Sequence, residues 1–374
     1  MATYYKRNKV FIPIEIKDSH KPCKLYGRYI KNSGVFNVIS DKPQPGYKFL
    51  GHITEETDFS GDLRLLVGVL KDDTLSFFYR NQRLDVEYYS LYQNVFSRNK
   101  GILESNIMNK KRAVILGCGS VGSLVAVELA RAGVGNFMLV DIDIVEYHNV
   151  CRHQCGIDDV GEFKVDAVER KIKNINPAAN VKKYVQIVEA LEKKDFDKFC
   201  ISGEDTIFIG CADNRAADVY ANKISALYNC YFLSIGFWER AAAGEIFYHI
   251  PNANMPCYLC AIGTRDANRA QAYHKFYTNQ TDLEKMNFEP GISIDINFVT
   301  TIGIKVALDL LNRNTQEYTP RLLDHLKQYT FICNTNNPKI GGDIVEIFSY
   351  PLQVTTSLRV TFNESCKGKC VFEE

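Results

Sequence analysis

The pattern of apolar and polar residues divides the chain near residues 95–110. In the first part, short β-like runs are separated by Pro, Gly, Asp and Asn, a pattern typical of a small, mostly antiparallel β unit. These runs cover residues 11–16, 24–30, 34–39, 47–53, 63–70 and 74–79. No catalytic pattern accompanies them, and the aromatic residues near the end of this part are expected to serve its core.

The second part alternates strand-like and helix-like segments. Strands are expected at residues 113–116, 136–140, 181–188, 206–210, 231–235 and 245–250, and helices at residues 123–132, 163–175 and 216–228. Such alternation predicts a doubly wound, mostly parallel, Rossmann-like sheet with helices on both faces. We therefore predict an α/β fold in which a small β-rich domain at residues 1–95 precedes a larger α/β domain at residues 96–374.

The charge balance narrows the classes of partner. The chain carries 45 Lys and Arg residues against 44 Asp and Glu residues, a formal net charge of +1, which argues against binding nucleic acid through a broad basic face. The N-terminus lacks the apolar segment of a signal peptide, and no apolar run approaches the ~20 residues of a membrane span. We expect a soluble, cytoplasmic protein with neither nucleic-acid nor membrane partners.

A glycine-rich turn follows the first strand of the α/β part. Gly117, Gly119 and Gly122 form a Gly-x-Gly-x-x-Gly pattern between the strand at 113–116 and the helix that follows it. Such glycines permit a tight turn, and the N–H groups at the helix N-terminus attract phosphate oxygens. Asp141 lies about 20 residues further on, where an acid can hydrogen-bond a ribose hydroxyl. This pattern predicts a nucleotide site without distinguishing NAD, FAD and ATP.

Several motifs after the glycine turn separate these cases. They are the Asp-x-Asp pair of Asp141 and Asp143, a Val-Glu-x-x-Asn-x-x-Arg segment with Asn149 and Arg152, a Gly-x-x-Lys segment ending at Lys164, and the pair Asp213 and Asn214. In this order the sequence resembles the ThiF/MoeB family of adenylyltransferases, the bacterial relatives of ubiquitin-activating enzymes. The resemblance covers roughly residues 98–370 and implies a Rossmann-like adenylation domain that uses ATP and magnesium.

The resemblance also implies a set of site residues. The nucleotide-binding set comprises Gly117, Gly119, Ser120, Gly122, Asp141, Asp143, Asn149, Arg152, Lys164, Asp213 and Asn214. Within it, the resemblance assigns Asp141 to the ribose and Asp213 to magnesium. It places Asn149, Arg152 and Lys164 around the ATP phosphates. Basic side chains are needed because a carboxylate and a phosphate, both anionic, must be brought together. Arg152, Lys164 and Asp213 are therefore expected to be catalytic.

A short segment before the glycine turn carries a further arginine. Residues 95–99 loosely resemble the segment in which the family supplies an arginine to the ATP phosphates of the neighbouring subunit. The resemblance therefore implies that Arg98 is a catalytic residue acting in trans and that the active form is a homodimer. An ordinary surface position is the alternative for this residue.

The sequence departs from the family pattern at three places. Ser120 replaces a glycine that is usual in the turn, and His153 stands between Arg152 and Gln154. The interval from Arg152 to Lys164 is one residue shorter than in the commonest members. None of these changes removes a charged catalytic group, so we expect an active site.

Two cysteine pairs are candidates for a structural zinc site with four thiolate ligands. They are Cys257 with Cys260 and Cys366 with Cys370. Spacing alone does not establish one site, but the resemblance implies it, because family members often carry one pair after the sheet and another near the C-terminus. Independent thiols remain the alternative.

The sequence offers no conventional thioester cysteine. In ubiquitin-activating relatives this residue usually lies on the loop after the first zinc pair, and here residues 261–298 contain no cysteine. Outside possibilities are Cys23, Cys151, Cys155, Cys230 and Cys333. Cys118, Cys211 and Cys230 lie in or beside apolar strand runs and are expected in the core. Adenylation without a thioester step is therefore favoured.

The function favoured by these observations is ATP-dependent adenylation of the C-terminal carboxylate of a ubiquitin-like or sulfur-carrier protein, with release of pyrophosphate. Adenylation of a short peptide, as in the synthesis of nucleotide-peptide antibiotics, is the alternative within the same chemistry. The domain at residues 1–95 would bind the partner in either case. An NAD-dependent oxidoreductase, or a nucleotide-sensing adaptor without catalysis, would leave Arg152, Lys164 and Asp213 unused.

Overall fold

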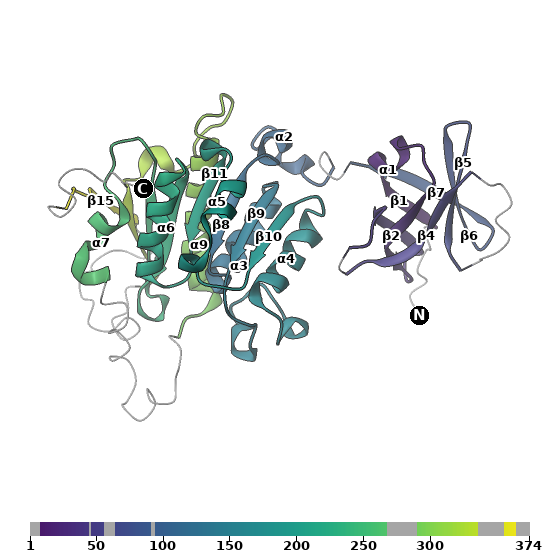
Figure 1. Ribbon diagram of the computed structural model, residues 1–374. Coiled ribbons are helices and arrows are strands. Elements are labelled where there is room, and N and C mark those ends of the chain that lie inside the picture. Colours follow the sequence, from purple (N-terminus) through teal and green to yellow (C-terminus); the bar gives the residue numbers. More distant parts are fainter. Residues whose placement is uncertain are drawn as a thin grey trace. The chain divides into compact units, whose positions relative to one another are not determined.

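The computed structural model describes residues 8–44, 46–55, 64–90, 94–267, 290–335 and 355–363. The chain divides into two compact units, residues 1–98 and residues 99–374 (Figure 1). None of the helices in the described ranges combines the length and the apolar composition of a membrane span.

The first unit is a seven-stranded sheet that closes into a barrel, in the order β1-β3-β2-β4-β5-β6-β7. Its elements are β1 (Lys9–Pro13), α1 (Ile14–Asp18), β2 (Cys23–Ile30), β3 (Val35–Ser40), β4 (Lys48–Thr54), β5 (Leu66–Lys71), β6 (Thr74–Tyr79) and β7 (Gln82–Tyr89). Pairing of β1 with β7 closes the sheet. Its core includes the fully buried side chains of Val10, Ile12, Leu25 and Phe77. The predicted β-rich first part is therefore confirmed.

Details of the barrel differ from the sequence-based expectation. Three strand pairs are parallel, namely β1 with β3, β1 with β7 and β4 with β5, alongside four antiparallel pairs. The run expected as a strand at residues 11–16 ends at Pro13, and Ile14–Asp18 forms a helical turn. Proline has no N–H to donate to a ladder, which fits the end of the strand there. Strand β7 was not expected.

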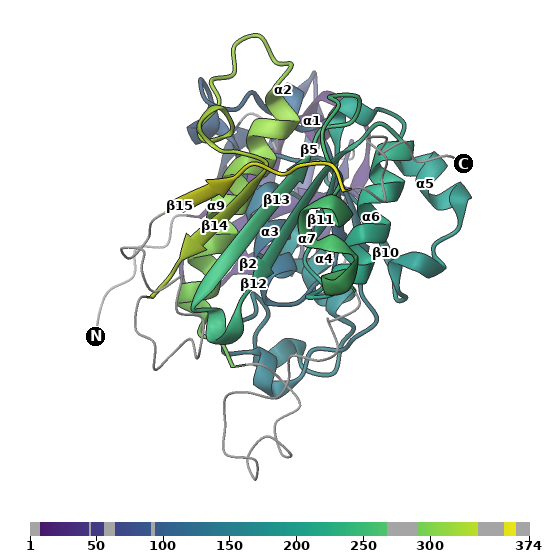
Figure 2. The same cartoon turned by 90° about the vertical axis from the view of Figure 1, so that its left-hand side faces the viewer.

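The second unit contains an eight-stranded sheet in the order β10-β9-β8-β11-β12-β13-β14-β15. The strands are β8 (Arg112–Leu116), β9 (Asn136–Val140), β10 (Asn180–Tyr184), β11 (Thr206–Gly210), β12 (Tyr231–Phe237), β13 (Ala243–His249), β14 (Tyr329–Cys333) and β15 (Thr355–Leu358). The first five strands in this order are parallel, and each later pairing is antiparallel. Figure 2 shows β12 to β15 side by side.

Helices cover both faces of this sheet (Figure 1). They are α2 (Ser105–Met108), α3 (Ser120–Arg131), α4 (Lys164–Ile175), α5 (Lys193–Phe199), α6 (Arg215–Leu227), α7 (Tyr258–Ala267) and α9 (Ser293–Asn312). Side chains of β8 alternate between two cores: Ile115 packs in the cluster that includes α3, α4 and α9, and Leu116 in the cluster that includes α5 and α6. The predicted doubly wound, mostly parallel sheet is confirmed.

The strand order creates a switch point beside β8. From β8 the chain moves through β9 to β10 on one side, and it returns to place β11 on the other side of β8. In open sheets of this kind, ligands bind beyond the carboxyl ends of the strands where the order reverses. The glycine turn follows β8, Asp141 follows β9 and Asp213 comes after β11. The topology therefore gathers these three features at one edge of the sheet.

Candidate active site

The glycine turn is held by two close backbone approaches. Gly117 has a φ of +88°, and a Cβ at this position would lie 2.7 Å from the Cα of Ala212. A Cβ on Gly122 would lie 1.8 Å from the carbonyl oxygen of Gly117. Both positions therefore require glycine. At Gly119, by contrast, a Cβ would meet no atom within 4 Å, so the turn faces open space there.

Helix α3 begins directly at this open space. Its N-cap is Gly119, which has no side chain to hydrogen-bond the N–H groups of the first turn. Ser120 is the first helical residue, and its carbonyl oxygen accepts a hydrogen bond from Ser123 Oγ at 3.3 Å. Unpaired first-turn N–H groups and the positive end of the helix dipole favour an anion. The turn thus suits a phosphate group.

Asp141 ties the end of β9 to the glycine turn. Its Oδ2 accepts a hydrogen bond from the N–H of Cys118 at 2.6 Å, and its Oδ1 accepts one from the N–H of Asp143 at 2.8 Å. A carboxylate has about four acceptor positions. Two of them therefore remain for ligand hydroxyls, such as those of a ribose, beside the turn.

Asp143 and Lys164 close the next loop. Lys164 Nζ lies 2.7 Å from Asp143 Oδ2, and the Lys164 N–H donates to the Asp143 carbonyl oxygen at 2.9 Å. The lysine side chain is 12% exposed and the aspartate side chain 58% exposed. An isolated β-bridge joins Ile144 to Phe163 between them. Residues 143–164 therefore form a loop with fastened ends, and Lys164 opens helix α4 at its base.

Asn149 and Arg152 lie within this loop. Asn149 Oδ1 accepts a hydrogen bond from the N–H of Glu146 at 2.9 Å, and this bond fixes the local turn. The guanidinium group of Arg152 reaches the start of α9, because a Cβ at Gly291 would lie 3.7 Å from Arg152 Nη1. The arginine therefore lies between its own loop and the segment that leads into α9.

Asp213 and Asn214 follow β11. Asp213 has a φ of +49°, in the left-handed region, within an exposed turn. Asn214 caps helix α6, because its Oδ1 accepts hydrogen bonds from the N–H groups of Ala216 at 3.0 Å and Ala217 at 3.2 Å. The close approach of Gly117 to Ala212 brings this turn against the glycine turn.

These contacts bring most of the expected site residues to one edge of the sheet. The glycine turn, Asp141, the Asp143–Lys164 pair and the Asp213 turn are joined there by the contacts described above. Arg98 lies in the first unit, on an exposed 3-10 turn at Ser97–Asn99.

Sequence analysis assigned no role to His153, which the structure places beside the glycine turn. His153 Nδ1 accepts the N–H of Cys155 at 3.0 Å, so Nε2 is the donor to the Cys118 carbonyl oxygen at 2.6 Å. Burial lowers the pKa of this imidazole and keeps it neutral. The only sequence signal was its insertion between Arg152 and Gln154. His153 thus holds the carbonyl group of Cys118, whereas Asp141 holds the N–H group of the same Cys118.

Two buried acids, Asp218 and Glu245, lie near Asp213, and each has its own polar partners. Asp218 Oδ2 accepts a hydrogen bond from Ser234 Oγ at 2.5 Å, and burial raises the pKa of Asp218 to about 7. Glu245 accepts hydrogen bonds from Tyr329 at 2.7 Å and Trp238 at 3.1 Å, and it lies 3.4 Å from Arg215. Sequence analysis missed these acids because they lie on separate elements and form no local motif.

The first cysteine pair is close enough to share a metal ion. Cys257 Sγ and Cys260 Sγ are 3.7 Å apart, and the N–H of Asn363 donates to Cys260 Sγ at 3.4 Å. Two thiolates about 2.3 Å from a tetrahedral ion are about 3.8 Å apart. Cys366 and Cys370 lie outside the described residues, and within the described ranges no three His, Cys, Asp or Glu side chains form a metal-binding group.

The remaining cysteines are mostly core residues. Cys118, Cys211 and Cys230 are buried, as predicted. Burial raises the pKa of the Cys155 thiol to about 12 and also raises the pKa of Cys23 and Cys333. Among the thioester possibilities considered from sequence, Cys151 is the exposed one, and its Sγ donates to the carbonyl oxygen of His148 at 3.3 Å.

Comparison with known proteins agrees with this geometry. Residues 98–340 match the ThiF family. The ubiquitin-like modifier-activating enzyme 5 of Bombyx mori is 29% identical over 187 residues, covering 45% of this chain and 46% of that protein. The Drosophila virilis enzyme of the same name is 28% identical over 200 residues, covering 49% of each chain. The chain thus spans about half the length of these curated relatives.

A solved structure has the same fold. The crystal structure of Escherichia coli MccB superposes with a TM-score of 0.50 at 19% identity, covering 72% of this chain and 68% of that chain. The family match covers well over half of the sequence, and it includes every residue of the glycine turn and of the loops at the sheet edge. The resemblance stated from sequence motifs is therefore confirmed, and this chain belongs to the ThiF family.

Proposed function

We propose that this protein uses ATP to adenylate the C-terminal carboxylate of a ubiquitin-like or sulfur-carrier protein and releases pyrophosphate. The observation that carries the proposal is the convergence of the glycine turn, the Asp143–Lys164 pair and the Asp213 turn at one sheet edge. A nicotinamide enzyme would use the turn and Asp141 but would leave the charged loop idle.

The chemistry needs charge compensation rather than a protein nucleophile. A carboxylate oxygen of the partner attacks the α-phosphorus, a new O–P bond forms, and the bond to pyrophosphate breaks with both electrons leaving on the pyrophosphate. Backbone N–H groups of the turn and the start of α3 would hold the phosphates. Preorganised cations at the developing charge lower the barrier because they need no reorganisation during the reaction.

Lys164 and Arg152 are the cations proposed for this task. Lys164 is already oriented by Asp143 at 2.7 Å and is largely shielded from solvent. In the proposed complex, phosphate oxygens share or replace the aspartate as its partner. Arg152 would act from the side of α9, near Gly291. Asn149, whose Oδ1 holds the loop, would offer its amide N–H groups to the nucleotide.

Asp213 is the residue proposed to hold magnesium. Its carboxylate oxygens are ligands of the kind that a hard divalent cation prefers. Its turn lies against the glycine turn, where the phosphates would bind. Bound magnesium would supply neutralisation of the departing pyrophosphate. Asn214 supports the same turn by capping α6.

A protein substrate is proposed from the relatives. The similar proteins of Bombyx mori and Drosophila virilis are named ubiquitin-like modifier-activating enzymes, and a Gly-ending tail is narrow enough to approach the α-phosphate. A short peptide with an exposed C-terminus offers the same carboxylate and is the alternative that the test below distinguishes. We also propose that the reaction takes place in the cytoplasm.

We further propose that the protein acts as a homodimer in which Arg98 of one subunit reaches the ATP phosphates bound by the other subunit. Arg98 is exposed, as this role requires. The loop at residues 142–163 also carries exposed large apolar side chains, including Tyr147 at 73% exposure and Ile157 at 62%. Such side chains beside a site favour a protein contact, and this contact would cover them.

A structural zinc ion is the last component of the proposal. The 3.7 Å separation of Cys257 Sγ and Cys260 Sγ suits two ligands of one tetrahedral ion. Asn363, which contacts Cys260, lies three residues before Cys366 in sequence. Cys366 and Cys370 would complete the site, and the ion would tie the C-terminal segment to α7.

ATP–pyrophosphate exchange tests the proposed reaction. The assay would use labelled pyrophosphate with ubiquitin-like proteins, sulfur carriers and C-terminal peptides, each with and without its terminal residues. Exchange that needs an intact protein C-terminus and is lost in Asp213→Ala supports the proposal, while Asp324→Ala, an exposed acid elsewhere in the unit, serves as the matched control. Exchange with peptides alone selects the alternative. ATP binding without any exchange indicates an adaptor, and failure to bind ATP overturns the assignment.

A further inference from the structure

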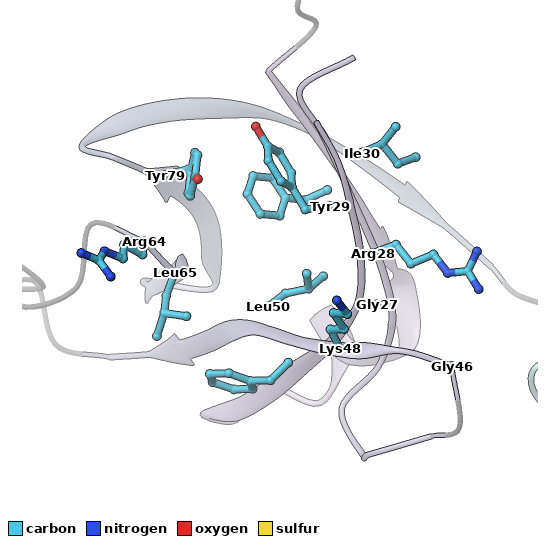
Figure 3. A pocket seen from close by; sticks show the side chains of 12 residues that line it. Gly27, Arg28, Tyr29, Ile30, Gly46, Lys48, Leu50, Arg64, Leu65 and Tyr79 are labelled. Atoms are coloured by element: carbon cyan, nitrogen blue, oxygen red, sulfur yellow. The ribbon is translucent and has the colours of Figure 1, made fainter. Parts of the chain in front are cut away.

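The barrel unit contains a pocket of about 570 Å³ that the proposed reaction does not use (Figure 3). It lies near the end of the pairing between β2 and β4. Its apolar side chains include Tyr29, Phe36, Phe49, Leu50, Leu65 and Tyr79. These residues come from four different strands and from the segment before β5. The pocket is therefore a product of the folded barrel rather than of one loop.

Aromatic rings form one side of this pocket. Tyr29 stacks on Phe36 with ring centroids 4.4 Å apart, and Tyr79 meets Phe36 edge-on at 4.9 Å. Phe36 is buried, but Tyr29 remains 37% exposed and Phe49 44% exposed. A large apolar side chain placed against these rings would remove that surface from water, which favours binding.

The charged residues that line the pocket in the described part of the barrel have one sign. They are Arg28, Lys48 and Arg64, and none of the described lining residues is acidic. Figure 3 shows Arg28 and Arg64 on opposite sides, with their side chains extending away from the centre. Lys48 is paired in the ladder with Gly27, next to Arg28. The cations thus surround an apolar pocket and favour carboxylates at its rim.

The backbone beside the pocket leaves one edge of β2 without a neighbouring strand. The ladder with β3 continues to Ile30, which pairs with Val35, whereas the ladder with β4 ends at Gly27 and Lys48. In the described part of the barrel, residues 28–30 therefore have a strand partner on the β3 side alone. Such an edge can pair with an extended peptide through main-chain hydrogen bonds.

We propose that this pocket binds an extended, acidic segment of the polypeptide that the enzyme adenylates. A bulky apolar or aromatic side chain of the segment enters the pocket, its backbone runs along residues 28–30, and flanking carboxylates meet the basic rim. The identity of the segment as part of the substrate rests on the proposed function. A nucleotide fits less well, because two of the three cations extend outward and would not meet phosphates held inside.

Peptide selection on the full-length chain tests this inference without knowledge of the substrate. A phage library of random dodecapeptides would be selected on the wild-type protein, on Tyr29→Ser and on Lys48→Glu. The expected consensus is a bulky apolar residue flanked by Asp or Glu. Tyr29→Ser is expected to lose the apolar preference, and Lys48→Glu to shift the flanking preference away from acids. Lys24→Glu, which changes an exposed cation of β2 outside the pocket, is expected to keep the wild-type consensus.

A synthetic peptide with the selected consensus then gives affinities by fluorescence anisotropy. We expect binding to weaken at least about tenfold in Tyr29→Ser and in Lys48→Glu, and by less than about twofold in Lys24→Glu. Thermal unfolding identifies a variant that fails to fold, and the two pocket variants test the inference separately. A consensus without acids, or equal affinity for all variants, overturns it. Binding of a fluorescent ATP analogue that depends on Tyr29 overturns it in favour of a nucleotide.

Failure of this inference is distinguishable from failure of the proposed reaction. Asp213→Ala is expected to bind the peptide like wild type while losing exchange. Peptide binding at the pocket without any exchange by wild type overturns adenylation, and the pocket then binds a polypeptide that is not adenylated. Exchange by a wild-type enzyme whose selected peptides ignore the pocket overturns the inference alone.

Discussion

His153 Nε2 donates to the carbonyl oxygen of Cys118 at 2.6 Å, and the N–H of the same Cys118 donates to Asp141 Oδ2 at 2.6 Å. The residue at the centre of the glycine turn is thus held through both of its backbone polar groups. Both contacts come from the connection between β9 and α4, which is separated from the glycine turn in sequence by α3 and β9. Together they fix the orientation of the peptide that faces the proposed phosphate site.

Loss of the imidazole should therefore weaken nucleotide binding. We expect His153→Leu to raise the KM for ATP in exchange by about tenfold or more, because the Cys118 carbonyl loses a buried partner and the turn relaxes. The kcat should change less than the KM, since no reacting group is removed. His325→Leu, at an exposed position on the 3-10 turn Leu323–His325, is the control. An unchanged KM would show that Asp141 alone fixes the turn.

The same imidazole predicts a direction for pH dependence. Burial lowers the native pKa of His153 below the ordinary value of about 6.5, so its contribution to stability is complete above that value. As the pH falls below it, the unfolded chain takes up a proton that the native state resists, and the free energy of unfolding decreases. When the pH is lowered from about 7.5 to about 5, the free energy of unfolding measured with urea should fall less in His153→Leu than in wild type.

Lys164 should matter for the reaction far more than for stability. Its pairing with Asp143 at 2.7 Å leaves the aspartate 58% exposed, and pairs open to water on one side contribute little to folding. We expect Lys164→Gln to lower kcat/KM in exchange by roughly 10²–10³-fold, the range for removal of one transition-state donor. Lys193→Gln, at an exposed position on α5, should stay within about twofold, and the melting temperatures of both should match wild type. Equal kinetics for the two variants would remove Lys164 from the proposed site.

Asp159 supports the loop that carries Asn149 and Arg152. It is buried, and although burial alone would raise its pKa, hydrogen bonds from the Gly156 N–H and from Arg170 and Lys171 lower it to about 2. The resulting stability is complete above the unfolded pKa of about 4 and is lost as the pH falls towards 2.

Asp159→Asn should therefore lower the free energy of unfolding near pH 7 by up to about 2 kcal/mol. The difference from wild type should shrink as the pH falls from about 4 to about 2, because the Asp159 carboxylate becomes protonated over this range. Urea titrations at several pH values measure this difference. A penalty that stays constant down to the lowest pH would mean that packing, rather than charge, is what the substitution disturbs.

Local signals explain why parts of the fold were predictable from sequence. Strands at residues 74–79, 136–140 and 206–210 have the same bounds in the structure, because each is a short apolar run between turn residues. The glycine turn was recognisable because backbone contacts at Gly117 and Gly122 exclude any side chain. These requirements act within a few residues, and a single sequence records them.

Other features depend on partners that are distant in sequence. Helix α9 (Ser293–Asn312) was not predicted, since it is rich in β-branched residues that favour strands, and its packing against α3 and β12 overrides that preference. The parallel pairing in the barrel was missed for a similar reason. The contact of His153 with Cys118 and the buried acids Asp218 and Glu245 likewise arise only when separate elements meet.

Zinc content gives the most direct test of the cysteine site. If Cys257 and Cys260 hold one ion with Cys366 and Cys370, purified protein should contain about one zinc per chain, and Cys260→Ser should lose most of it. The variant should also melt at a lower temperature, because metal binding is linked to folding. Cys151→Ser, at an exposed cysteine outside the pair, should keep both the zinc and the melting temperature.

The contact of Asn363 with Cys260 predicts that zinc loss releases the C-terminal segment, so limited proteolysis should cleave it faster in Cys260→Ser than in Cys151→Ser. Full-length protein with no bound zinc, prepared without chelator, would leave the 3.7 Å approach of the two sulfurs as a packing contact between thiols.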